Sequence, residues 1–220
     1  MPRRLLFLVA GLVAVTSCTR SSSAAFTTQT VPTTLPPSST STSVLVLAVP
    51  PPAPITITGA GFDLHTAGRV PTAAFDAAWA GVLDTLNRYL EVAVVNPLRS
   101  GGPAGDLAPY FSGPAAAKVT VVGPDRGAFI EESLPPLSDL REETGVAQLT
   151  GLAGADGVMS VITANLDLRL IGHVAGSPVT VVRTGELVLM PEGGRWRIDA
   201  YDLKVVRSQA EDTTTTTVRS

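Results

Sequence analysis

The longest regular pattern of apolar positions predicts a helix over residues 72–96. These positions recur at spacings of three and four, which places them along one face of a helix. They are Phe75, Trp79, Val82, Leu86, Leu90 and Ala93. Thr72 is a candidate N-cap, and we expect the helix to end at Asn96, because Pro97 disfavours helical backbone in the residue before it.

The second half of the chain alternates apolar and polar residues, as β-strands do. Four segments show this pattern between turn sequences: 146–153, 158–174, 179–190 and 195–207. The dipeptide Asp156-Gly157 between the first two is a strong hairpin signal. We therefore expect an antiparallel meander with one buried face and one face in water.

The last of these segments changes phase by one residue. Trp196 and Ile198 share one phase, whereas Tyr201 and Leu203 take the other. Such a slip predicts a β-bulge or sharp bend near residues 200–202. Between the long helix and the strands, three stretches predict short helices that cap the domain; they are 107–111, 115–119 and the turns between Pro124 and Pro135.

The start of the chain has the pattern of an export signal. Arg3 and Arg4 precede an uncharged apolar run from Leu5 to Val15, which is shorter than the roughly 20 residues of a membrane-spanning helix. The sequence Val-Thr-Ser-Cys that follows resembles a bacterial lipoprotein box. We therefore expect Cys18 to be acylated and to become the first residue of the mature protein. The paired arginines also resemble a twin-arginine signal, but two arginines are common in such leaders, so we expect export by the general secretory route.

Other roles for Cys18 fit the sequence less well. A cysteine in a signal segment cannot lie in a folded core, and the only cysteine of a chain has no intramolecular disulfide partner. From Ser21 to Phe62 there is no charged residue, and Ser, Thr and Pro dominate, which predicts a disordered spacer. The expected layout is a signal peptide at 1–17, a spacer at 18–53, a folded domain at 54–207 and a disordered Thr-rich tail at 208–220.

Composition excludes several kinds of function. With 16 Lys and Arg against 19 Asp and Glu, and no basic stripe interleaved with aromatics, nucleic-acid binding has no support. Two histidines and one cysteine make a metal site improbable on ligand grounds. Gly59-Ala60-Gly61 lacks the third glycine of a dinucleotide fingerprint. We expect no cofactor.

The order of a long helix, capping helices and a meander ending in "GGRWRIDAYDLKVVR" resembles the nuclear-transport-factor-2-like (SnoaL-like) superfamily. It is similar to domains of actinobacterial cell-envelope lipoproteins, and the segment from Trp196 to Asp199 is the best match. The resemblance implies an α+β, cystatin-like cone in which a long N-terminal helix packs in a curled antiparallel sheet of about four strands. The residues it implies as lining of the cone are Trp79, Leu86, Arg183, Trp196 and Tyr201.

Fold alone does not select a function within this superfamily, which includes isomerases and dehydratases as well as non-catalytic domains. Arg183 has the phase of its apolar neighbours, so it either reaches inward or marks a sheet edge. Most other polar strand residues fit a solvated face with cross-strand ion pairs. We therefore expect a membrane-anchored extracytoplasmic lipoprotein that binds a partner protein or a small apolar ligand without catalysis.

Two further expectations remain open. The alternative function is a cryptic isomerase or dehydratase, with Asp199, Tyr201 or Asp202 turned into the cone as acid or base. Because related cone domains often pair through the outer face of the sheet, a homodimer is the default oligomeric state.

Overall fold

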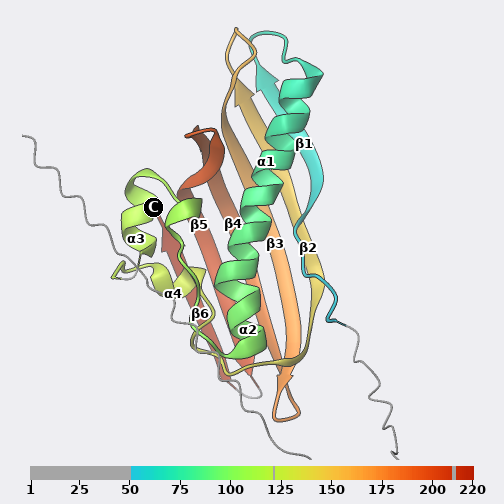
Figure 1. Ribbon diagram of the computed structural model, residues 1–220, viewed down its shortest axis with the longest axis vertical. Helices are drawn as coiled ribbons and strands as arrows, with labels where there is room; N and C mark the ends of the chain where they lie inside the picture. The colour runs from blue at the N-terminus through green and yellow to red at the C-terminus, as the bar shows by residue number, and fades with distance from the viewer. Residues whose placement is uncertain (1–50, 121, 210–211) are drawn as a thin grey trace, which may run out of the picture. The chain divides into compact units, whose positions relative to one another are not determined.

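A six-stranded mixed sheet is the framework of this computed structural model, which describes residues 51–120, 122–209 and 212–220 (Figure 1). The strands lie side by side in chain order, from β1 to β6. Only β1 runs parallel to its neighbour, and the other pairs are antiparallel. The strands are β1 (Thr58–Thr66), β2 (Ser138–Ala153), β3 (Met159–Val174), β4 (Ser177–Glu192), β5 (Arg195–Gln209) and β6 (Asp212–Arg219).

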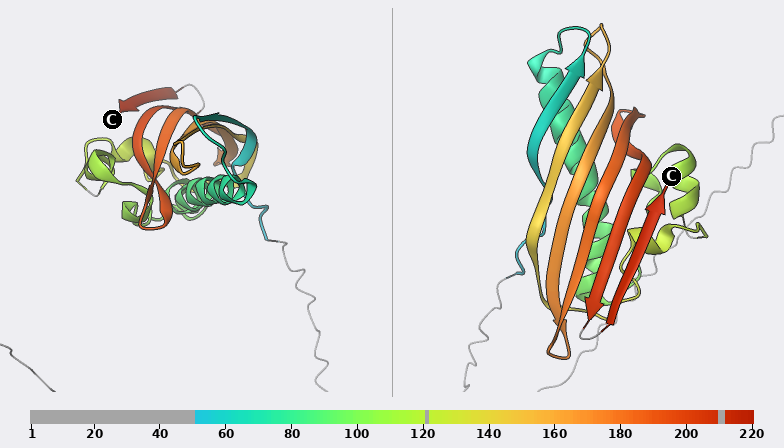
Figure 2. Two further views of the ribbon diagram at one scale, coloured as in Figure 1. Left: turned by 90° about the horizontal axis from the view of Figure 1, so that it is seen from above. Right: turned by 180° about the vertical axis from the view of Figure 1, so that it is seen from behind.

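The helices lie on one face of this sheet. The long helix α1 crosses that face, and short helices lie beside β5 and β6, whereas the opposite face carries no described helix (Figure 2). The helical elements are α1 (Thr72–Leu90), the π-helix η1 (Glu91–Val95), α2 (Asn96–Ser100), the 3-10 turn η2 (Ala108–Tyr110), α3 (Gly113–Val119) and α4 (Arg126–Phe129). The expected capping helices are therefore present, with shifted bounds.

The long helix begins at Thr72 as predicted, with Pro71 rather than Thr72 as its N-cap, but its predicted end at Asn96 is wrong. The chain stays helical to Ser100. The π-turn of η1 widens the helix, so that the N–H of Asn96 bonds the carbonyl of Glu91, five residues back. Pro97 then lies in the first turn of α2, where a missing N–H costs nothing.

The core lies between α1 and the covered face of the sheet. Val82, Leu86 and Leu90 of α1 are at most 1% exposed, as are Leu168 and Leu170 of β3. The predicted alternation along β3 is confirmed from Ile162 to Leu170. Val158, the first residue of the predicted segment 158–174, precedes the strand in the hairpin turn and is exposed.

The predicted fold class is wrong. The sheet has six strands rather than about four, it is mixed rather than antiparallel, and the long helix follows a strand instead of opening the domain. The missing strands have weak sequence signals. β1 contains Gly59, Gly61 and Asp63, residue types that are rare in strands, and its partner lies far along the chain.

The tail expected to be disordered at 208–220 is also different. Its residues 212–219 form β6, which pairs with β5 along its length. The run of threonines shows no apolar alternation, so it has the composition of a polar tail. Threonine is nevertheless β-branched and favours extended backbone. The predicted signal peptide and the spacer up to residue 50 lie outside the described residues.

The phase change in the last long strand is confirmed as a bulge. Val188 pairs with Ala200 and Leu189 with Ile198, which leaves Asp199 as the extra residue of β5, one position before the predicted range. Because of this extra residue, Ile198 and Tyr201 both face the core and are at most 2% exposed.

Candidate functional site

A cleft of about 670 Å³ lies along α1, from Pro71 before its first turn to Arg88 in its last turn. One wall is the helix, and the others come from η2, the β2–β3 turn and the β4–β5 turn. This volume falls within the range of about 300–1,000 Å³ that is usual for small-molecule sites. The lining includes Ala74, Ala77, Gly81, Asp84, Arg88, Tyr110, Asp156, Met159, Arg195 and Trp196.

Small side chains on α1 create the space of the cleft. Ala74, Ala77, Ala78 and Gly81 repeat at helical spacing on the side of α1 that faces it. The indole of Trp196 lies against Gly81 so closely that a Cβ at position 81 would come within 2.9 Å of it. The hydroxyl of Thr85 donates to the carbonyl of Trp196 at 2.8 Å, which fixes this wall to the helix.

The polar groups of the cleft lie mostly on α1. Nε of Arg88 donates to Asp84 Oδ1 at 2.8 Å, one turn earlier on the helix. This carboxylate raises the pKa of Arg88, so the guanidinium remains charged. In the β2–β3 turn, Oδ1 of Asp156 accepts the backbone N–H of Val158 at 3.1 Å. The cleft therefore combines an apolar floor with charged groups at its rim.

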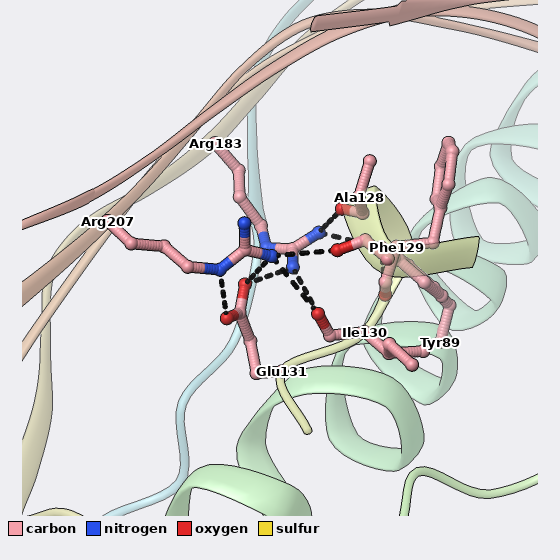
Figure 3. Close-up of polar contacts among 8 residues, drawn as sticks. Tyr89, Ala128, Phe129, Ile130, Glu131, Arg183 and Arg207 are labelled. Atoms are coloured by element: carbon pink, nitrogen blue, oxygen red, sulfur yellow. Dashed lines mark hydrogen bonds and ion pairs between the residues drawn. The ribbon is translucent and has the colours of Figure 1, made fainter. Parts of the chain in front are cut away.

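A second polar cluster lies between the α4 segment and strands β4 and β5 (Figure 3). Glu131, which is completely buried, forms ion pairs with Arg183 of β4 and Arg207 of β5. Nε of Arg207 donates to Glu131 Oε2 at 2.6 Å. Nη1 of Arg183 also donates to the carbonyl of Ala128 at 2.7 Å. This buried triad holds the segment after α4 against the sheet.

Tyr89 of α1 completes the enclosure of the triad. Its hydroxyl donates to the carbonyl of Phe129 at 3.0 Å and accepts Nη1 of Arg183 at 3.2 Å. Burial raises the pKa of Tyr89, so the phenol stays neutral beside the guanidinium. For Arg183, burial alone would lower the pKa, but the nearby Glu131 carboxylate outweighs burial and the pKa is raised. None of these groups lines the α1 cleft. We therefore assign the triad a structural role, which is to hold the segment after α4 against the sheet.

The three residues of the alternative acid/base hypothesis make structural contacts instead. Asp199 accepts the hydroxyl of Ser112, which precedes α3, at 3.0 Å. Tyr201 donates to Asp125 Oδ2 at 2.6 Å, and burial together with this hydrogen bond raises its pKa. Asp202 forms an ion pair with Arg219 of β6. These contacts connect three elements to β5, namely α3, the segment before α4, and β6. None of the three residues lines the cleft.

The expected lining residues separate into four environments. Leu86 and Tyr201 lie in the core, and Arg183 belongs to the buried triad. Trp79 packs over Gly59 of β1, where a Cβ would come within 2.1 Å of its ring. Only Trp196 of the five lines the cleft. Cys18, the predicted lipidation site, lies outside the described residues.

Sequence reasoning missed most of the cleft. Asp84 and Arg88 lie outside the apolar positions that predicted the helix, so the pattern gave them no role in a site, and the alanines carry no chemical signal by themselves. The one available signal is the repeat of Ala and Gly at helical spacing on the exposed side of α1. Such a repeat shows which side of the helix carries small side chains, but not which other segments of the chain lie opposite them.

The described residues hold no cluster of three or more potential metal ligands of the His, Cys, Asp and Glu types. In the same part of the chain, no helix is both long enough and apolar enough to cross a membrane. No protein-family model, curated protein or solved structure matches this chain. The resemblance to the nuclear-transport-factor-2-like superfamily therefore stays a prediction.

Proposed function

We propose that this protein is a lipid-anchored extracytoplasmic domain that binds a small apolar ligand in the α1 cleft without chemical conversion. The observation that carries the proposal is the cleft itself, which has ligand-sized volume and a floor of Ala, Gly, Met and Trp side chains. Anchoring through Cys18 rests on the sequence of the leader and the cysteine.

The polar groups near the cleft support binding more than catalysis. Acid/base catalysis needs a titratable side chain that reaches the reacting atoms and has a pKa tuned toward the working pH. The carboxylates at the cleft, Asp84 and Asp156, already accept hydrogen bonds from Arg88 and from the backbone of Val158. The tyrosine with the clearest shift, Tyr201, lies away from the cleft and its pKa is raised.

A bulky substitution on the cleft side of α1 tests this proposal. Ala77 lines the cleft and is exposed, so Ala77→Trp fills the space without entering the core. We expect the wild-type chain, purified from its own envelope, to retain a small molecule in native mass spectrometry, and A77W to lose it. Saturating ligand at a hundredfold Kd should also raise the free energy of unfolding by about 2.7 kcal/mol in the wild type alone.

Ala80→Trp is the matched control. Ala80 is also exposed on α1 but does not line the cleft, so A80W adds the same indole elsewhere on the helix and should keep the ligand. Equal retention by A77W and the wild type would contradict binding in the cleft, as would a wild-type chain that carries nothing and binds no apolar compound.

A further inference from the structure

We propose that the ligand of the α1 cleft carries an oxyanion, a carboxylate or a phosphate, that is bound by Arg88. This inference deepens the proposed function and rests on it, because it names the chemical class of the ligand in the same cleft. Several hydrogen-bond donors along the cleft have no acceptor among the described residues.

Arg88 has more donors than the protein uses. A guanidinium has five N–H donors in a planar fork. Only Nε has an acceptor among the described residues, Asp84 Oδ1, so the two terminal amino groups are available. The bond at Nε restricts the plane of the fork, and a planar fork is the group that best matches a carboxylate or phosphate.

Two further donors line the same space. The indole N–H of Trp196 and the hydroxyl of Tyr110 have no hydrogen-bond partner within the part of the chain that the structure describes. Arg195, another lining residue, forms no ion pair with any described residue. The cleft thus presents several donors with unused capacity.

The side-chain acceptors of the cleft are fewer than its unused donors, and one oxygen of each lining carboxylate is already hydrogen-bonded. Oδ1 of Asp84 is bonded to Arg88, and Oδ1 of Asp156 accepts the N–H of Val158. A ligand that brings its own acceptors therefore satisfies the cleft better than one that brings donors. Since Ala74, Ala77 and Met159 provide an apolar surface beside these groups, the fitting ligand is an amphipathic anion with an apolar body.

The formal charges of the lining sum to zero, so they do not exclude an anionic ligand. Asp84 and Arg88 neutralise each other on the helix, while Asp156 and Arg195 belong to two different turns. A mobile anion that reaches the terminal amino groups of Arg88 forms charge-assisted hydrogen bonds, which are about twice as strong as neutral ones. A neutral head group lacks this contribution.

The test compares an anionic and a neutral probe with the same apolar body. We would measure binding of dodecanoate and dodecanol to the full chain by calorimetry at pH 8, where the acid is ionised. We expect dodecanoate to bind about 10-fold or more tightly than dodecanol, and Arg88→Gln to remove that advantage, because a hydrogen bond to a charged group is lost. The neutral probe should bind R88Q as well as it binds the wild type.

Arg141→Gln is the control. Arg141 is an exposed arginine of β2 that does not line the cleft, so its loss changes the net charge by the same amount without touching the site. Because the Arg88 side chain is 67% exposed, R88Q should fold normally, which an unfolding curve verifies. Arg88→Lys keeps the charge but loses the planar fork, and should recover only part of the affinity.

The outcomes separate the two proposals. Equal binding of both probes, with R88Q and R141Q alike, overturns the oxyanion while the apolar cleft stands. A preference for dodecanoate that R141Q removes as fully as R88Q overturns the role of Arg88. Binding that A77W leaves unchanged, or no binding of either probe to the wild type, overturns the proposed function as well.

Discussion

At the scale of single residues, Glu131 has the most demanding environment in the described chain. It is completely buried and is the one carboxylate that Arg183 and Arg207 share, so the triad has one excess positive charge. Burying charge is costly unless the charges are paired and hydrogen-bonded. Carbonyls of Gly127, Ala128 and Ile130 accept further guanidinium donors and reduce this cost, although Nε of Arg183 has no partner among the described residues.

Replacing Glu131 by Gln should therefore destabilise the protein strongly. The side chain keeps its shape, but two buried guanidinium groups lose the one carboxylate that pairs with them among the described residues. We expect E131Q to lower the free energy of unfolding by about 3–5 kcal/mol, the usual loss when one partner of a buried ion pair is removed. Urea unfolding at neutral pH measures this change.

Glu132→Gln is the control for this prediction. The neighbouring Glu132 side chain is 34% exposed and pairs with Arg126 at 3.2 Å. A partly solvated pair contributes at most about 1 kcal/mol. If E131Q and E132Q lowered the free energy of unfolding equally, the buried triad would not have the structural role that the geometry indicates.

Only part of this triad was predictable from the sequence. Arg183 has the phase of buried neighbours, which correctly indicated that it was either inward or at an edge, and it is inward. Glu131 lies in a segment without helical or strand periodicity, so no pattern marked it as buried. Its role depends on where the α4 segment meets β4 and β5, and that contact is tertiary.

At the scale of elements, β4 contains an unusual position at Gly185. Its φ of 144° is a conformation that side chains rarely adopt. A Cβ there would lie 2.0 Å from the carbonyl oxygen of Asp202 on the neighbouring strand. The close approach of β4 and β5 at this point therefore requires glycine.

Gly185→Ala should separate these two strands locally. We expect a loss of stability of about 1 kcal/mol from the backbone conformation and a further 1–3 kcal/mol or so from the clash. Gly176→Ala is the matched control, because Gly176 also has a positive φ of 85° but no atom within 4 Å of the added Cβ. Thermal unfolding should show a clearly larger loss for G185A, and equal losses would contradict the close approach.

Elements with strong local patterns were predictable, and those without were not. The start of α1, the meander from the second half of β2 to β5, the Asp156-Gly157 turn and the phase change in β5 follow from periodicity and turn chemistry, whereas β2 begins at Ser138 rather than at the predicted residue 146. The sequence pattern did not predict that the helix continues past Pro97. The π-turn before it places Pro97 in the first turn of α2, where no helical hydrogen bond needs the N–H that proline lacks. β1 and β6 were missed because backbone pairing with a neighbour, rather than their own pattern, makes them strands.

At the scale of the whole molecule, the proposed anchor is testable independently of the cleft. We expect Cys18→Ser to prevent acylation, so that the protein leaves the membrane fraction of its native host. Intact mass of the wild-type protein should show a chain that begins at Cys18 and carries fatty acyl groups. Ser17→Ala, which keeps a small residue before the cysteine, should still fractionate with the membrane. A wild-type chain without acyl groups would contradict the proposed location.

The site itself needed the assembled molecule. The helix wall of the cleft is local in the sequence, but η2 and the two hairpin turns reach it only through the sheet. The sequence resemblance implied a cone around the helix, and residues such as Leu86 were assigned to a cavity that the side chains of the core occupy. Which face of a helix borders an open space depends on the number and order of strands.

The parallel pairing of β1 with β2 has a consequence for the order of folding. β3 and β4 are joined by a two-residue turn, at 175–176, whereas the chain from Thr66 to Ser138 separates β1 from β2. Loop-closure entropy grows with the length of the loop, and non-local pairings form slowly. The strands of the meander can therefore pair first, and β1 pairs with β2 only after α1 has docked on the sheet. We expect unfolding to begin at this edge of the sheet.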